Sequence, residues 1–158
     1  MSSRIVKDFD MSKFRELRAR LEGLAGKEVV VGVTRATAGR GQTGQINNAE
    51  LAAVHEFGTR DGLIPERSFI RSSMHDNRDD YVGMHAGNLR KVVRGEMQFE
   101  KSLDLLGVKA ASDVQEKIRR GELEPLKPAT IQRKGSSTPL IDTGNLRQSI
   151  THEVRDAD

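Results

Sequence analysis

Two long stretches of helical periodicity occupy the middle of this 158-residue chain and limit the folds open to it. Apolar residues recur every three or four positions from residue 76 to about 94, and again from about 98 to 120. That spacing predicts two amphipathic helices, the longest elements of the chain. Gly107 interrupts the second helix at a cost of about 1 kcal/mol relative to alanine, so we expect close packing or a bend there. Gly121 is expected to end it.

Two segments outside these helices predict a small sheet. Residues 29–33 are Val-Val-Val-Gly-Val, which is typical of a buried strand. Residues 150–154 alternate apolar and polar side chains, as a half-buried strand does. The predicted fold class is therefore α+β, with a small mixed or antiparallel sheet packed against the two long helices. A chain of this length leaves no room for a second domain of ordinary size, so residues 1–158 form a single domain. The order of the strands stays open.

Shorter elements are predicted around the first strand. The spacing of apolar residues from 14 to 24 indicates a first helix. Asn47, with Glu50 three residues later, has the form of a capping box that begins a short helix, and Gly58 is expected to end that helix. Pro65 then disfavours helix and predicts a rigid connector.

The composition indicates a thin core. Hydrophobic residues make up 35% of the chain and aromatic residues 4%, with no tryptophan, so the core is expected to consist of Val, Leu, Ile and Ala. A small core leaves little free energy above the entropic cost of ordering the chain. We therefore expect an obligate oligomer whose subunits gain part of their order from one another.

The composition also argues against several classes of protein. The absence of cysteine excludes disulfides and thiolate metal sites. No apolar run approaches 18 residues and the first residues lack the apolar centre of a signal peptide, so we expect a soluble protein without membrane contact. The formal charge of +3 is too small to indicate nucleic-acid binding by itself.

Three patterns resemble catalytic or ligand sites, and each fails in its context. Residues 39–44 match the spacing G-x-G-x-x-G, but five residues separate them from the strand, whereas a dinucleotide site begins directly at the strand end. His55-Glu56 lacks the second histidine that a zinc-protease helix needs one turn later. The aspartates of residues 76–80 are better explained by Asp76 as a helix N-cap than by a cation site. We therefore expect no enzyme activity, no cofactor and no metal.

Two acid-free segments carry basic side chains. One spans residues 29–49 and includes a Gly-rich loop, 34–46, which is expected to be mobile; the other is a loop at residues 125–141. Their basic residues are Arg35, Arg40, Lys127, Arg133 and Lys134. These side chains could contact DNA phosphates or the surface of a partner protein, and both alternatives stay open. Without aromatic residues for stacking, the loops give no sign of base recognition.

The run Pro-Leu-Ile-Asp-Thr-Gly-Asn-Leu near the C-terminus predicts a tight corner before the last strand. Asp142 or Thr143 can cap the short helical turn that follows, and Gly144 is expected to permit a close approach between chain segments. Leu146 and Ile150 are four residues apart and are expected to share one face.

Two further blocks, residues 51–59 and 64–71, are Leu-Ala-Ala-Val-His-Glu-Phe-Gly-Thr and Ile-Pro-Glu-Arg-Ser-Phe-Ile-Arg. With the corner, in this order, they resemble the neck and tail-completion proteins of tailed bacteriophages, a family that includes the minor tail protein Z of phage lambda. The resemblance runs from about residue 29 to 154, although residues 74–122 match only as generic helix. Ser68 departs from the pattern, because the family often has proline there.

The resemblance implies a non-enzymatic structural protein of the virion. Such a protein would form a homo-oligomeric ring, with six subunits expected, at the neck or top of the tail, and would assemble in the host cytoplasm. Its partners would be copies of itself, a head-closure or connector protein, and a tail terminator or tail tube protein, with non-specific contact to DNA in the channel. The residues that match the family blocks are assigned to fold and interface geometry, and they are Phe57, Gly58, Pro65, Phe69, Leu140, Asp142, Gly144 and Leu146. The alternative is a non-virion regulatory protein that uses its basic loops on nucleic-acid phosphates.

Overall fold

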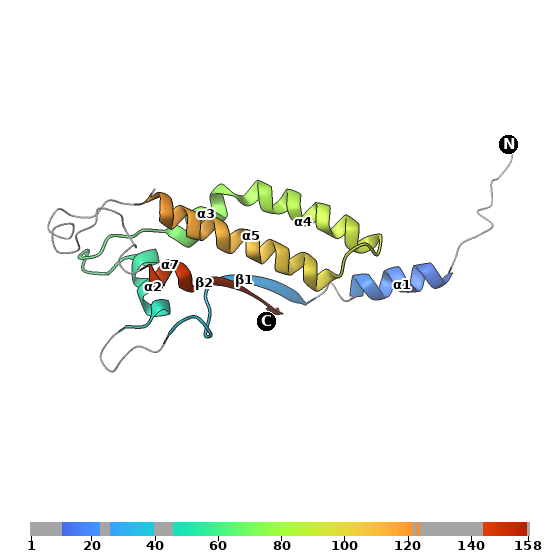
Figure 1. Ribbon diagram of the computed structural model, residues 1–158, viewed down its shortest axis with the longest axis horizontal. Helices are drawn as coiled ribbons and strands as arrows, with labels where there is room; N and C mark the ends of the chain where they lie inside the picture. Colours follow the sequence, from blue (N-terminus) through green and yellow to red (C-terminus); the bar gives the residue numbers. More distant parts are fainter. Residues whose placement is uncertain (1–10, 23–25, 40–45, 122, 124–143, 158) are drawn as a thin grey trace.

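The computed structural model describes residues 11–22, 26–39, 46–121, 123 and 144–157, apart from the side chains of residues 20 and 21. Six helices and two strands make up this part of the chain (Figure 1). In order they are α1 (Met11–Glu22), β1 (Lys27–Val33), α2 (Asn48–Phe57), α3 (Phe69–Asp76), α4 (Arg78–Val93), α5 (Phe99–Arg120), α7 (Asn145–Ser149) and β2 (Ile150–Asp156). The α+β class is confirmed, and the elements form one domain.

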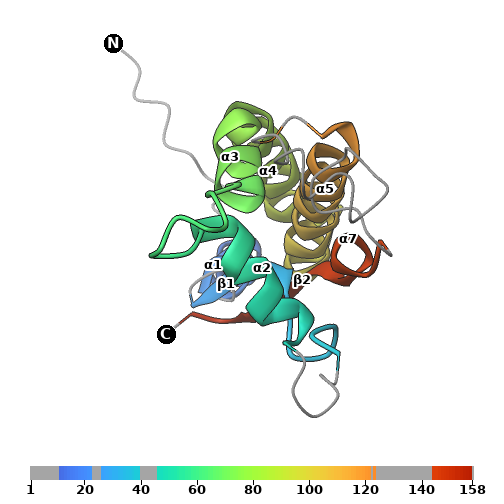
Figure 2. The ribbon, with the colours of Figure 1, turned by 90° about the vertical axis from the view of Figure 1, so that its left-hand side faces the viewer.

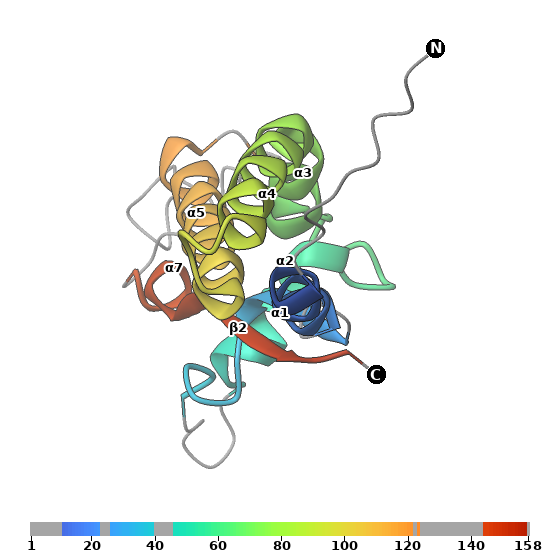
Figure 3. The ribbon, with the colours of Figure 1, turned by 90° about the vertical axis from the view of Figure 1, so that its right-hand side faces the viewer.

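The sheet consists of β1 and β2 alone, paired antiparallel from Lys27 opposite Asp156 to Val33 opposite Ile150. Helix α5 packs across both strands, whereas α4 packs mainly on α5 and also contacts α3 and α1 (Figures 1 and 3). The prediction of two long helices against the sheet is therefore only half correct. The reason is that α4 buries only Asn88 and Val92, while α5 has a long buried face that covers the strands.

The core is small and lies where α2, α3, α7 and β2 meet the C-terminal half of α5. Its buried residues are Ala52, Phe69, Ala111, Val114, Ile118, Leu146 and Ile150. Phe69 is the one aromatic side chain among them, in line with the expected aliphatic core. The β1 strand was predicted to be buried, but its residues from Glu28 onward are only half-buried. Within the described part of the chain, α5 covers one face of the two-stranded sheet, and α2 contacts β1.

Several local predictions are confirmed. The capping box is formed, because Glu50 N–H donates to Asn47 Oδ1 at 2.9 Å and Asn47 N–H donates to Glu50 Oε2 at 2.8 Å. Gly121 ends α5 in the left-handed conformation, with φ +67°. Gly107 is a close-packing point: a Cβ atom there would lie 2.2 Å from the His152 ring on β2.

One helix boundary was predicted wrongly. Asp76 is the last residue of α3 and not the N-cap of α4, which begins after Asn77. Helix α3 forms because Phe69 and Ser73 bury one of its faces, a tertiary effect that local capping signals do not contain. Asp76 instead pairs with Lys117 of α5, at 2.5 Å. The hydrogen bond from Lys117 lowers the pKa of this carboxyl group below its ordinary value.

Candidate functional site

A buried carboxylate joins the two central sequence blocks. Glu56 belongs to the last turn of α2 and is 4% exposed. Its oxygens accept hydrogen bonds from Ser68 Oγ at 3.0 Å, from the backbone N–H of Ile70 at 2.9 Å and from the backbone N–H of Arg71 at 3.0 Å. Because N–H groups in the first turn of a helix have no partner within it, Glu56 acts as the N-terminal cap of α3. The carboxylate therefore fixes α3 against α2.

The Arg71 side chain covers the solvent side of the Glu56 carboxylate. Its Nε donates to Glu56 Oε1 at 3.0 Å, and one of its terminal nitrogens donates to the Glu56 carbonyl at 3.0 Å and to Glu66 Oε1 at 2.7 Å. The guanidinium carbon also lies 4.9 Å from the centroid of the Phe57 ring, a cation–π distance. The hydrogen bond to Glu56 raises the pKa of Arg71 above its ordinary value. Phe57 is held in place by this stacking although it is 65% exposed.

The connector between α2 and α3 is tightly constrained, as its proline predicted. Thr59 N–H donates to the Ile64 carbonyl at 2.9 Å, and Arg67 N–H donates to the His55 carbonyl at 2.7 Å. Gly58 ends α2 with φ +71°, and a Cβ atom there would lie 2.8 Å from the backbone nitrogen of Glu66. Glycine is therefore required at this position by both conformation and space.

A groove of about 540 Å³ lies beside this connector, between β1 and α2. We call it the α2 groove. Its lining includes Val30, Gly32, Ala49, Ala53, Phe57 and Ile70. Ala49, Ala53 and Phe57 recur every four residues along one face of α2. Apolar residues predominate in the lining, which also includes the charged residues Arg35, Glu56, Arg71, Glu153 and Arg155. The β1 edge beside the groove has no strand partner within the described part of the chain.

Large apolar side chains are exposed on Phe57, which lines the groove, and on the segments that flank α2 in the chain. Besides Phe57, Leu63 in the connector is 71% exposed and Ile46, just before α2, is 57% exposed. Figure 2 views this end of the molecule, with α2 in front of the sheet. An apolar groove beside exposed apolar side chains is a feature of protein interfaces. The arrangement is suited to binding another protein surface.

The structure brings together four of the predicted motif residues and places two others at the corner. Phe57, Gly58, Pro65 and Phe69 belong to α2, the connector and α3, and Phe69 is fully buried. Gly144 and Leu146 lie at the start of α7; these six residues keep their assignment to fold and interface geometry as a prediction. Leu140 and Asp142 lie outside the described residues, as does Thr143, so the predicted side-chain cap of the corner is not described.

Gly144 has φ +78°, a conformation that favours glycine. Among the described residues, the nearest atom to a Cβ at this position is Gln148 Nε2 at 3.8 Å, which is an ordinary contact. The close approach between chain segments expected at Gly144 stays a prediction, because the residues just before it lie outside the described part of the chain. The shared face of Leu146 and Ile150 is confirmed, since both are buried in the same cluster.

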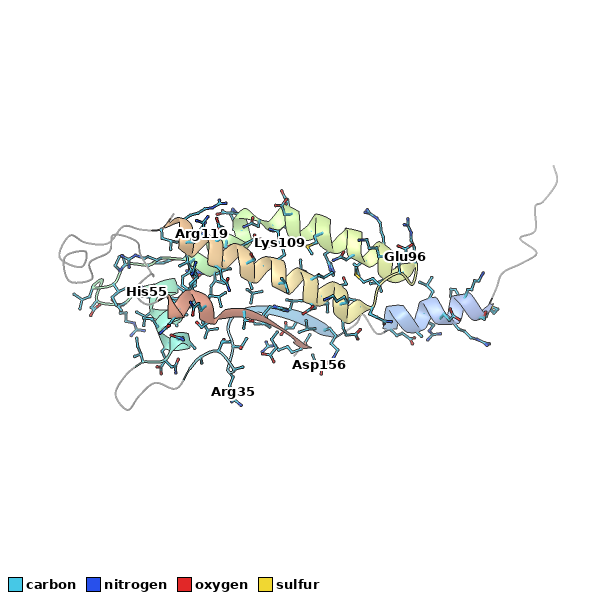
Figure 4. All side chains as sticks on the ribbon, viewed as in Figure 1. Arg35, His55, Glu96, Lys109, Arg119 and Asp156 are labelled. Atoms are coloured by element: carbon cyan, nitrogen blue, oxygen red, sulfur yellow. The ribbon has the colours of Figure 1, made fainter. Side chains whose placement is uncertain are left out.

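Of the predicted basic residues, the structure describes Arg35 alone. It lies in the turn that follows β1, lines the α2 groove, and points away from the body of the molecule in Figure 4. The remaining four, Arg40, Lys127, Arg133 and Lys134, lie outside the described residues. Whether these basic residues contact DNA or a partner protein stays open, as predicted from the sequence.

Within the described segments, no group of His, Asp and Glu side chains is arranged to hold a metal ion. None of the described helices is long and apolar enough to cross a membrane.

His152 pairs with Asp104 at 2.9 Å, and this hydrogen bond lowers the pKa of the aspartate. Ser149 Oγ donates to the Leu146 carbonyl at 2.7 Å, so the hydroxyl has a structural role in the corner.

Sequence reasoning missed Glu56, which it considered only as part of a zinc-binding pair. Two signals were present: an acid in the last turn of a short apolar helix, and a following segment, Pro-Glu-Arg-Ser, that could begin another helix. Neither signal indicates that the two helices meet.

Comparisons with protein-family models, curated proteins and solved structures found no match to this chain.

Proposed function

We propose that this chain is a structural protein of a tailed-phage virion. It completes the tail and joins it to the head connector as an oligomeric ring around the DNA channel. Its neighbours are a head-closure or connector protein on one side and a tail terminator or tail tube protein on the other. No catalytic role is assigned to any residue.

The observation that carries the proposal is the relation between the two central sequence blocks. Residues 51–59 and 64–71, which resemble the phage proteins, form α2, the connector and the start of α3, and Glu56 holds them together. These elements build one wall of the α2 groove and display Phe57 and Leu63 to solvent. A rigid apolar surface of this kind supports assembly with other subunits better than it supports catalysis.

The test is removal of the gene from the phage or prophage that carries it. Electron microscopy of the lysate should then show filled heads and separate tails, and a plasmid copy of the gene should restore joined particles. Averaged images of intact particles should show the protein in rotational symmetry at the head–tail junction. Joined, infectious particles made without the gene would refute the proposal. A purified protein that binds DNA with a steep salt dependence and is absent from particles would favour the regulatory alternative.

A further inference from the structure

Helix α1 has little of its surface covered by the rest of the described chain. Figure 1 shows it extending beyond the start of α5, and Figure 3 views that end of the molecule, with α1 in front. Its described side chains are exposed at every position except Leu17, which is half-buried. A helix of 12 residues is marginally stable in water by itself, so α1 needs a surface on which to pack.

The exposed surface of α1 includes an apolar face. Met11, Phe14 and Leu17 recur at three-residue spacing, so they lie on the same side of the helix. Met11 is 51% exposed and Phe14 is 47% exposed. Large apolar side chains at this spacing are the anchors by which an amphipathic helix binds an apolar groove.

The α2 groove has a largely apolar lining, and its helical wall, α2, lies at the opposite end of the long axis from α1 (Figures 1 and 2). Its strand wall is residues 30–33 of β1, about 13 Å long, and its helical wall runs from Ala49 to Phe57 of α2, about 12 Å long. The apolar face of α1 from Met11 to Leu17 is about 9 Å long, so it fits between these walls. The small side chains of Ala49 and Ala53 let a second helix approach α2 closely.

We propose that α1 of one copy packs into the α2 groove of the next copy. Because the two surfaces differ and lie at opposite ends of the molecule, the contact is heterologous, and its repetition gives a closed ring when the rotation closes. The inference deepens the proposed function by naming the contact that builds the ring. Only the closing of the contacts into a ring rests on the proposed function; the contact between two copies does not. One contact then covers both the apolar face of α1 and the apolar groove.

The first test is a mixing experiment with two full-length variants. Phe14→Asp damages α1 and leaves the groove intact, whereas Ala53→Asp damages the groove and leaves α1 intact. Each variant alone should be monomeric by analytical ultracentrifugation at concentrations where the unaltered protein assembles. An equal mixture should form dimers, because one intact α1 and one intact groove are present. Val108→Asp, at an exposed apolar position of α5, is the matched control and should assemble normally.

A mixture that stays monomeric while the unaltered protein assembles would overturn the proposal, as would an unaltered protein that is monomeric throughout. Either single variant that still forms full assemblies would also overturn it. Circular dichroism must show that both variants keep the helical content of the unaltered protein. If a variant fails to fold, the second test replaces it, because that test introduces no charge.

The second test uses the absence of cysteine from the chain, so that engineered thiols react without background. Copies with Ala53→Cys are mixed with size-tagged copies carrying cysteine at position 11, 14 or 18 and treated with a short thiol-specific cross-linker. At least one α1 position should give a product joining a tagged and an untagged copy. Gly83→Cys, on the exposed surface of α4, replaces Ala53→Cys in the control and should give none. Equal yields with the control would overturn the proposal.

The two proposals fail separately. If the cross-link forms but virions lack the protein, the proposed function fails and the contact between copies stands. If the protein is present at the head–tail junction but the cysteine pairs give no cross-link within those particles, the contact fails and the proposed function stands.

Discussion

Replacing Glu56 by glutamine tests whether a single buried carboxylate holds α2 and α3 together. The change keeps the shape of the side chain and removes its charge. A glutamine has one carbonyl oxygen, which can replace only one of the two carboxylate oxygens. If that oxygen keeps the Ser68 and Arg71 hydrogen bonds, the new NH₂ group faces the backbone N–H of Ile70, where two donors then oppose each other.

The cost follows from the number of bonds and from burial. A hydrogen bond to a charged group contributes about 1.5–3 kcal/mol, and a buried donor left without an acceptor costs about 1–3 kcal/mol. Arg71 is half-exposed, so water can solvate its guanidinium and its contribution is discounted. Two costs then remain, the Ile70 N–H without an acceptor and the weakened cap of α3. We therefore expect the free energy of unfolding to fall by about 3 kcal/mol. With a urea m-value of about 2 kcal/mol/M, the unfolding midpoint should fall by about 1.5 M.

Glu66→Gln is the matched control. Glu66 pairs with the same arginine at 2.7 Å, but its side chain is 56% exposed. Exposed ion pairs contribute about 0–1 kcal/mol, so the midpoint should fall by less than about 0.5 M. Far-ultraviolet circular dichroism during urea titration measures both variants, which suits a chain without tryptophan. Equal midpoints for the two variants would refute the assignment of Glu56 as the cap of α3.

Three further predictions concern α5 and the corner. Gly107→Ala should lower the melting temperature because its methyl group would overlap the His152 ring. Gly83→Ala is the control; its methyl group meets nothing within 4 Å, so it should raise stability by about 0.5–1 kcal/mol. Similar effects of both changes would contradict the close packing at Gly107. The arginine partners of Glu116 lower its pKa from 4.5 to about 2, so the stability that this group contributes above pH 4.5 is lost as the pH falls toward 2. Glu116→Gln should therefore flatten the plot of urea midpoint against pH in that window, and parallel curves would count against it. Leu146→Asp should prevent folding, because it places a charge without a partner among the buried residues, and an unchanged melting temperature would disprove that placement.

The elements that sequence predicted correctly are those whose signals are local. The capping box of Asn47 and Glu50 lies within four residues, and Gly121 follows directly on the helix that it ends. Both depend on the conformation of one turn, which adjacent side chains determine. The two strands are more than 100 residues apart in the chain. The sequence predicted that they belong to a small sheet, but it did not predict that they pair with each other or that the pairing is antiparallel.

The features that sequence did not predict depend on contacts between distant segments. Glu56 reaches Ile70 and Arg71 across 14 and 15 residues, and nothing in the local pattern of α2 indicates that its last turn meets the start of another helix. The packing of α4 beside α5, and not on the sheet, follows from how few apolar side chains α4 buries.

The same physical distinction applies to the proposed interaction surface: composition predicted that the chain depends on neighbouring subunits, but it did not predict where such a surface would lie. A chain with 4% aromatic residues was expected to depend on neighbouring subunits, and one of its six large aromatic side chains, Phe57, is largely exposed beside the α2 groove. Its position there is set by Arg71, which Glu56 holds at the start of α3. The buried carboxylate therefore links the stability of the domain to the form of its exposed surface. Any change that releases Arg71 from Glu56 should alter assembly as well as unfolding, and the two effects should appear in the same variants.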